Sequence, residues 1–118
     1  MSHRMSIGQK HDAMQNWGVT HFIAMPTDVW SQISAEADSV TPFLKDIKRQ
    51  LSKEASSGDL LLVQGDFGAT YNMVQYAKEI GMVPVYATSV RRAHEIVHGE
   101  KVTTIREFVH VQLRKYEG

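Results

Sequence analysis

The stretch Asp59–Tyr71 constrains the fold more than any other part of the chain. It reads D-L-L-L-V-Q-G-D-F-G-A-T-Y, an apolar run at Leu60–Val63 followed by two glycines and then by apolar residues at helical spacing. A continuous apolar run is typical of a strand buried on both faces, as in the middle of a parallel sheet. The order therefore predicts a strand, a tight turn and a helix.

The turn between this strand and this helix is suited to a ligand. Gly65 and Gly68 permit positive φ or a close approach of the backbone, and the helix after them points unpaired N–H groups at the same place. Such a junction suits a phosphate or a nucleotide. The spacing matches neither G-x-G-x-x-G nor the phosphate loop that ends in Gly-Lys-Ser/Thr, so the motif alone names no ligand.

One helix and one strand are predicted at the start of the chain. Ser6–Gln9 has the form of a capping box, which predicts a helix that runs to about Trp17 and ends at Gly18. We expect Met14 and Trp17 on its inner face. The apolar residues of Val19–Met25 then predict a strand, which Pro26 would end.

Two further segments precede the central stretch. Thr27–Asp38 is expected to form one or two loose turns at an edge of the core. Thr41 followed by Pro42 is a good helix start, with Thr41 as the cap. Apolar residues recur from there at spacings of three and four, which predicts an amphipathic surface helix ended by the Ala55–Gly58 segment.

After the central turn, the sequence predicts a helix, a strand and a hairpin. The helix covers about Ala69–Ile80, and Val83–Ala87 is a short strand that should run parallel to the first because a helix crosses between them. Ala93–Val97 and Val102–Leu113 are rich in Val, Ile, Thr and Phe, and His98–Lys101 between them suits a hairpin turn. The alternation predicts a layered α/β sheet with a C-terminal β-hairpin.

A helix across Arg91–Val97 is the alternative to the first hairpin strand, because its residues are good helix formers. The segment His94–His98 also reads H-E-x-x-H, the zinc-protease pattern. That pattern requires a helix, a third ligand downstream and an open cleft, whereas a hairpin places His94 and His98 on one face of a strand. Gly99, directly after the motif, favours the hairpin.

Composition limits the classes of function. The 118 residues fit a single domain, 1–118, and thirteen basic residues balance thirteen acidic ones, so no global field attracts long nucleic acid. The absence of Cys excludes disulfides, thiolate metal sites and a Cys nucleophile. No apolar run approaches membrane-spanning length and the first residues do not form a signal peptide, so we expect a cytoplasmic protein without a membrane partner.

Motifs spread along the whole chain carry a resemblance to a known family. They are Ser2-His3-Arg4, Trp30 after Met-Pro, V-Q-G-D-F-G-A-T-Y at 63–71, P-V-Y-A-T at 84–88, Arg91 and F-V-H-V-Q-L-R-K-Y at 108–116. In this order they resemble the small stand-alone CRISPR-associated ring nucleases of the Csx group. Members of that group begin with a hydrophobic strand before the Ser-His pair, which this sequence lacks.

The resemblance implies a fold, a ligand and an activity. The fold would be a Rossmann-like domain related to CARF sensors, and the protein would act as a homodimer. It would bind a cyclic oligoadenylate made by a type III CRISPR complex and cleave it, which ends the signal. Cyclic tetra-adenylate is the expected ring, and neither a metal nor another cofactor is expected. The alternative is a non-catalytic sensor or sponge for the same messenger.

The substrate itself explains how a Cys-free domain could be a nuclease. Each ribose of a 3′,5′-linked ring carries a 2′-hydroxyl beside a phosphodiester, so in-line attack by that oxygen opens the ring. The protein need only hold 2′-O, phosphorus and 5′-O collinear and stabilise the charge that develops. A general acid or base would add about 10²–10⁴-fold.

Three residues are the catalytic candidates, and each has a simpler alternative. His3 is the candidate proton carrier, unless the N-terminus is unordered. Asp66 would orient a ribose hydroxyl, or it caps the following helix. Arg91 follows the C-terminal end of a strand, where open α/β sheets bind ligands, and would hold a phosphate unless it is an ordinary exposed charge.

The other candidates would bind the substrate. They are Gln64, Gly65, Phe67, Gly68, Ala69, Thr70, Thr88 and Arg92. Phe67 would stack on adenine, or it fills the core. Thr70 and Thr88 would donate hydroxyls to phosphate, or they bond to nearby backbone as Thr commonly does.

Overall fold

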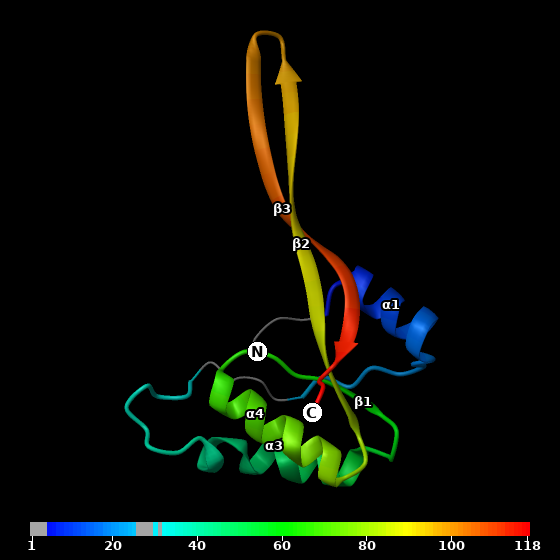
Figure 1. Cartoon of the computed structure of the whole chain (residues 1–118), viewed down its shortest axis with the longest axis vertical. Helices are drawn as coiled ribbons and strands as arrows, with labels where there is room; N and C mark the ends of the chain where they lie inside the picture. Colours follow the sequence, from blue (N-terminus) through cyan, green and yellow to red (C-terminus); the bar gives the residue numbers. More distant parts are fainter. Residues whose placement is uncertain (1–4, 26–29, 31) are drawn as a thin grey trace.

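The structure, a computed structural model, describes residues 5–25, 30 and 32–118. Within them the chain is α/β, with three helices and a mixed sheet of three strands (Figure 1). The elements in chain order are α1 (Ile7–Trp17), α3 (Thr41–Glu54), β1 (Leu60–Leu62), α4 (Phe67–Glu79), β2 (Val83–His98) and β3 (Lys101–Lys115). The predicted strand, turn and helix at the centre of the sequence are confirmed.

The sheet has the order β1-β2-β3. Strands β1 and β2 are parallel, with Leu60 opposite Val83, because α4 crosses between them as predicted. Strands β2 and β3 form an antiparallel hairpin with a bulge at Thr88/Ser89. Helix α4 packs against β2, α3 packs against α4, and α1 packs against β3.

The hairpin is longer than predicted. Val83–Ala87 and Ala93–Val97 were expected as separate strands, but they belong to a single strand of 16 residues. Ladder pairing with β3 continues without interruption from the bulge to the turn, so nothing separates the two segments. Residues 89–110, here called the arm, extend away from the helices (Figure 1).

The arm excludes two alternatives left open by the sequence. Residues 91–97 are strand, so the helix alternative is wrong. The H-E-x-x-H pattern therefore lies on a strand, where His94 and His98 are about 13 Å apart along the chain, too far to share one metal ion. No group of three or more potential metal ligands occurs among the residues that the structure describes.

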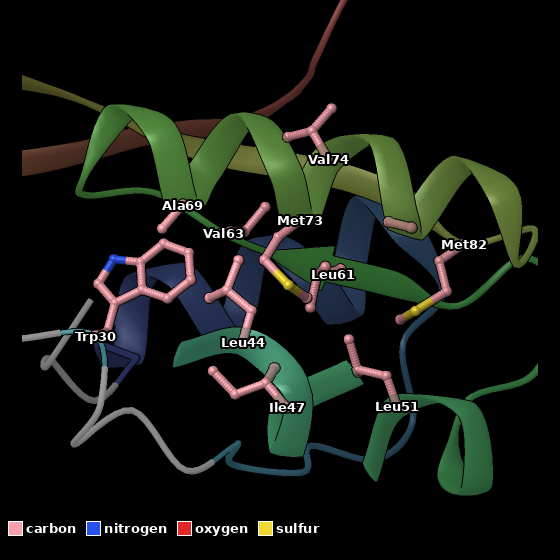
Figure 2. Packing of buried hydrophobic residues seen from close by; sticks show 11 residues of the cluster. Trp30, Leu44, Ile47, Leu51, Leu61, Val63, Ala69, Met73, Val74 and Met82 are labelled. Carbon is pink, nitrogen blue, oxygen red and sulfur yellow. The ribbon is translucent and has the colours of Figure 1, made fainter. Parts of the chain in front are cut away.

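The hydrophobic core lies between α3, α4 and β1 (Figure 2). Its buried members are Trp30, Leu44, Ile47, Leu51, Leu61, Val63, Ala69, Met73, Val74, Ala77 and Met82. The apolar stripe of α3 supplies Leu44, Ile47 and Leu51 at helical spacing. Leu44 is fully buried, so the predicted amphipathic face of α3 is the one that contacts the core.

The predicted strand at Val19–Met25 is wrong. Residues 18–25 have no regular structure. Phe22 and Ile23 are 38% and 61% exposed, so this segment has no buried face to hold it against the sheet. The expectation for Thr27–Asp38 falls partly on residues 26–29 and 31, which lie outside the described residues; Trp30 from this segment is buried.

Two helix starts test the capping predictions. The capping box of α1 is confirmed, since Ser6 accepts from Gln9 N–H and the Gln9 side chain accepts from Ser6 N–H. The inner face of α1 was assigned wrongly at Met14, which is 48% exposed; Trp17 is half-buried, and Asp12 and Ala13 are the buried residues. Thr41 is the first helical residue of α3 and not its cap; Val40 is the N-cap and makes no side-chain cap bond, while Ser39 Oγ accepts from the Thr41 amide.

Candidate functional site

The turn from β1 into α4 is shaped by Gly65 and Asp66. Gly65 has φ 130°, a conformation that residues with a Cβ rarely adopt. Asp66 is the N-cap of α4, and its carboxylate accepts from the Ala69 amide at 2.9 Å. Asp66 therefore caps the helix that follows it, which was the simpler alternative to a role in orienting a ribose hydroxyl. The amides of Phe67 and Gly68 belong to the same first turn, which a helix leaves without internal partners.

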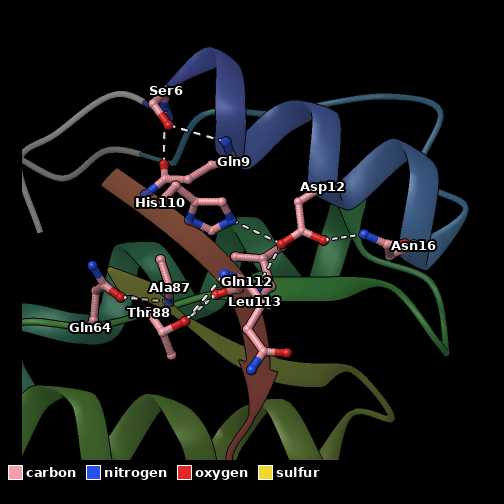
Figure 3. A network of polar contacts seen from close by, with 10 residues as sticks. All are labelled: Ser6, Gln9, Asp12, Asn16, Gln64, Ala87, Thr88, His110, Gln112 and Leu113. Carbon is pink, nitrogen blue, oxygen red and sulfur yellow. Dashed lines mark hydrogen bonds and ion pairs between the residues drawn. The ribbon is translucent and has the colours of Figure 1, made fainter. Parts of the chain in front are cut away.

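Two side chains near this turn, Gln64 and Thr88, make hydrogen bonds between neighbouring strands (Figure 3). Gln64 Oε1 accepts from the Ala87 amide at 2.9 Å, which ties the end of β1 to β2. Thr88 Oγ1 donates to the Gln112 carbonyl and accepts from its amide. Gln64 thus bonds to the residue next to Thr88. Thr88 makes bonds to nearby backbone, the alternative to donating its hydroxyl to a phosphate.

An aromatic pair stands on the first turns of α4. Phe67 is 94% exposed, so it does not fill the core. Tyr71, four residues later and hence on the same face of the helix, is 69% exposed. Sequence reasoning missed Tyr71, although its spacing from Phe67 could have revealed it. Two exposed rings at a helix N-terminus offer a surface on which a nucleobase can stack.

Ala69 and the Thr70 hydroxyl face inward from the first turn, whereas Gly68 is exposed. Ala69 is fully buried, and its amide is taken by Asp66. The Thr70 hydroxyl oxygen is also buried and has no hydrogen-bond partner within the described residues. Gly68 lies against Val40, whose methyl carbon would be 3.6 Å from an added Cβ.

A cluster missed by sequence reasoning lies at the end of β1. Tyr116 donates its hydroxyl to the Val63 carbonyl, and its ring lies 4.8 Å from that of Tyr86. Burial first, and the nearby Tyr86 hydroxyl second, raise the pKa of Tyr116. Arg114 lies over the Tyr86 ring and donates to its hydroxyl at 3.2 Å.

Arg114 shares a face of the hairpin with Tyr86 and Thr88. Tyr86 pairs with Arg114 across the ladder, and Thr88 is two residues farther along β2. The structure thereby places the Arg114 guanidinium against Tyr86, one residue along β2 from Ala87, whose amide donates to Gln64. The sequence alone suggested that Arg114 was a solvated surface charge.

The two predicted arginines on β2 are separated. Arg91 and Arg92 are consecutive in a strand and so point to opposite faces of the arm. Arg91 lies over the Phe108 ring at 5.2 Å, in an open hollow of about 280 Å³ lined by Arg91, Arg106, Glu107 and Phe108. Arg91 is three residues beyond Thr88, or about 10 Å along the strand. The residues 64–70 do not line this hollow.

A buried polar network that sequence reasoning missed attaches α1 to β3 (Figure 3). Asp12 Oδ2 accepts from the Leu113 amide at 2.7 Å and lies 2.9 Å from His110 Nε2, while Oδ1 accepts from Asn16 at 2.7 Å. A carboxylate only accepts, so His110 Nε2 carries a proton. Burial alone would raise the pKa of Asp12, but the bonds from Asn16, His110 and Leu113 outweigh it and lower the pKa.

Two remaining features bear on the predicted site. His3 lies outside the described residues, so its position relative to the turn is not part of this geometry. No helix among residues 5–25, 30 and 32–118 has both the length and the apolar character needed to cross a membrane.

The comparisons with known proteins agree on one family. The family model described as "Uncharacterized protein MJ1673 family" matches residues 1–114. "Uncharacterized protein MJ1673" of Methanocaldococcus jannaschii is 42% identical over 118 residues, covering 98% of this chain and 92% of that protein. No solved structure gives a significant match. Because the family model covers almost the whole chain, the protein belongs to the MJ1673 family.

Proposed function

We propose that the protein is a ring nuclease that binds and cleaves cyclic oligoadenylate, with cyclic tetra-adenylate as the expected ring. Cleavage would end type III CRISPR signalling in the cytoplasm. The β1, α4 and β2 unit would then be the ligand-binding part of a Rossmann-like domain related to CARF sensors. The observation that carries the proposal is the turn between β1 and α4, where the exposed rings of Phe67 and Tyr71 stand at a helix N-terminus.

Each component fits a part of an adenylate ring. Phe67 and Tyr71 would stack on adenine, which base–aromatic contacts favour by about 1–3 kcal/mol per base. Arg114 would bind a phosphodiester with its planar fork of donors. The amides of Phe67 and Gly68 would donate to the same anion, as helix N-termini commonly do. Gly65 would let the backbone come close to the ribose.

The proposed reaction uses the ribose 2′-oxygen as the nucleophile. That oxygen attacks the adjacent phosphorus as its proton leaves, the bond from phosphorus to 5′-O breaks, and the 5′-oxygen takes up a proton. The products are a 2′,3′-cyclic phosphate and a 5′-hydroxyl, so no water is consumed in this step. The protein contributes alignment of the three atoms and donors for the charged transition state.

The first test follows the ring itself. Purified protein is incubated in excess with radiolabelled cyclic tetra-adenylate, with and without EDTA. The proposal expects linear products that end in a cyclic phosphate in both samples. An intact ring after long incubation would refute the nuclease activity, and turnover that EDTA abolishes would refute the metal-independent mechanism.

The role of Asp66 can be separated from its capping role. Asn caps a helix about as well as Asp, so Asp66→Asn keeps the bond to Ala69 N–H while removing the charge. If the carboxylate orients a ribose hydroxyl, cleavage by Asp66→Asn falls by about 10²-fold with an unchanged melting temperature. Wild-type turnover would show that Asp66 only caps.

A non-catalytic sponge is the second candidate. The geometry that favours it is the Asp66 carboxylate, which is already engaged by the Ala69 amide and so is poorly placed to act on a substrate. A sponge would bind cyclic tetra-adenylate and return it intact. Calorimetric binding with Arg114→Gln as the variant tests this ligand site independently of turnover, and a loss of about tenfold or more is expected. Lys45→Gln, an exposed cation on α3 away from the turn and the arm, is the matched control.

A further inference from the structure

The arm, residues 89–110, exposes apolar side chains on both faces. Six of them are between 38% and 70% exposed. By ladder register, one face carries Val90, Ile96 and Ile105, and the other carries Val97, Val102 and Phe108. A hairpin that packs on its own domain buries one face, but every residue of the arm from 89 to 108 is exposed. Both faces of the arm thus lack a covering layer within the described part of this chain.

Such an arm is not stable through its own contacts. A two-stranded hairpin without a third strand or a packed helix is marginal in water. The ladder is disrupted at the Thr88/Ser89 bulge, and the hydrogen bond from the Leu113 amide to Asp12 holds only the base of the arm. The distal ladder therefore needs a partner surface.

The surface area of the whole chain, arm included, shows how much more surface it exposes than a compact monomer. A monomer of 13.3 kDa is expected to expose about 6,450 Å². This chain exposes 8557 Å², about 2,100 Å² more than that. Its radius of gyration is 17.4 Å, against about 13.5 Å for a compact chain of this length. A standard protein interface needs only about 800 Å² from each partner.

The charged side chains of the arm indicate what kind of molecule it binds. Cationic and acidic side chains on the arm nearly balance; they are Arg91, Arg92, Lys101 and Arg106 against Glu95, Glu100 and Glu107. A nucleic acid would require a strongly basic surface. A surface that mixes both signs with apolar residues can complement itself when two copies meet about a two-fold axis.

We propose that the arm is a dimerisation element that packs against a second copy of this chain. The apolar residues of both faces become buried when each arm lies across the other copy, and the charges of opposite sign face each other around them. The excess area of each chain is more than enough for a stable interface. This proposal rests on the arm alone and does not depend on ring cleavage.

The test measures mass in solution and protection of the arm. Wild-type protein should sediment at twice 13.3 kDa over a wide concentration range. Val97→Asp and Ile105→Asp place a charge on opposite faces of the arm and should each shift the mass to a monomer. Ile23→Asp is the control, since Ile23 is 61% exposed outside the arm, and it should remain dimeric.

Hydrogen exchange distinguishes dissociation from unfolding. In the arm variants, the amides of residues 89–110 should lose protection while those of α3 and α4 keep it, because the core does not include the arm. A wild-type monomer at all concentrations would overturn the proposal. A dimer that persists in both arm variants would overturn it as well.

Discussion

The buried carboxylate of Asp12 provides the sharpest test of how α1 is held to the hairpin. Three donors converge on it: Asn16 on Oδ1, and His110 together with the Leu113 amide on Oδ2. Asp12→Asn preserves the size of the side chain but replaces one oxygen by NH₂. With its NH₂ on the Oδ2 side, the new amide faces the His110 and Leu113 donors. With its NH₂ on the Oδ1 side, Asn16 must turn over to accept, and the bonds on Oδ2 lose the carboxylate charge.

The size of the effect follows from that mismatch. Asp12 is only 8% exposed, so water cannot replace the lost acceptor. Each buried donor left without a partner costs about 1–3 kcal/mol. We expect Asp12→Asn to destabilise the fold by about 3 kcal/mol at neutral pH, and to lower the melting temperature by roughly 10 °C.

The pH dependence has a definite sign. The folded state lowers the pKa of Asp12 below its ordinary value of 3.8, so the folded state favours the charged carboxylate. Its contribution is therefore fully present above the ordinary value and is lost as the pH falls through the lowered pKa. The stability difference between wild type and Asp12→Asn should shrink in that acidic range.

The assay is thermal unfolding followed by circular dichroism from neutral to acidic pH. Asp46→Asn is the matched control: its side chain is 80% exposed, and its ion pair with Arg49 is worth about 0–1 kcal/mol. A loss for Asp12→Asn no larger than that of the control would refute the reasoning. So would a difference that stays constant as the pH is lowered.

Two further predictions concern the core and the turn. Leu44→Ala removes a fully buried side chain from α3 and should lower the free energy of unfolding, measured by chemical denaturation, by about 2–5 kcal/mol. The control Leu44→Met conserves the side-chain volume and should lower it by less than about 1.5 kcal/mol. Gly65→Ala forces a Cβ onto a residue with φ 130° and should lower the free energy of unfolding by about 1–3 kcal/mol. The control is Gly8→Ala, inside α1 and without positive φ, which should be neutral or slightly stabilising. Equal losses in the two variants would contradict the backbone conformation assigned to Gly65.

The elements that the sequence predicted correctly are those with local causes. The capping box of Ser6 and Gln9 acts over three residues, and the turn before α4 needs only Gly65 and the Asp66 cap. Gly99, with φ 62°, marks the hairpin turn in the same way. The apolar stripe of α3 is equally local, because its spacing alone determines which residues share a face.

The prediction failed where a partner far along the chain decides the outcome. Val19–Met25 has the composition of a strand, but a strand also needs an adjacent ladder and a covering layer, and neither is found in the described residues. Residue type likewise could not reveal that Arg91 lies on the arm over Phe108 while Arg114 contacts Tyr86 near the base of the hairpin. That distinction depends on the register of β2 against β3.

The sequence by itself determined the central strand, turn and helix, the amphipathic helix α3 before them, the capping box of α1 and the existence of a hairpin. Only the tertiary structure decided that the hairpin becomes a projecting arm and that Tyr116 donates to the Val63 carbonyl. It also decided that Asp12 accepts from the Leu113 amide, 101 residues away in the sequence. Local propensities and caps involve neighbours within a turn, so composition and spacing encode them. Contacts between distant residues depend on how all the elements pack together, which no short pattern contains.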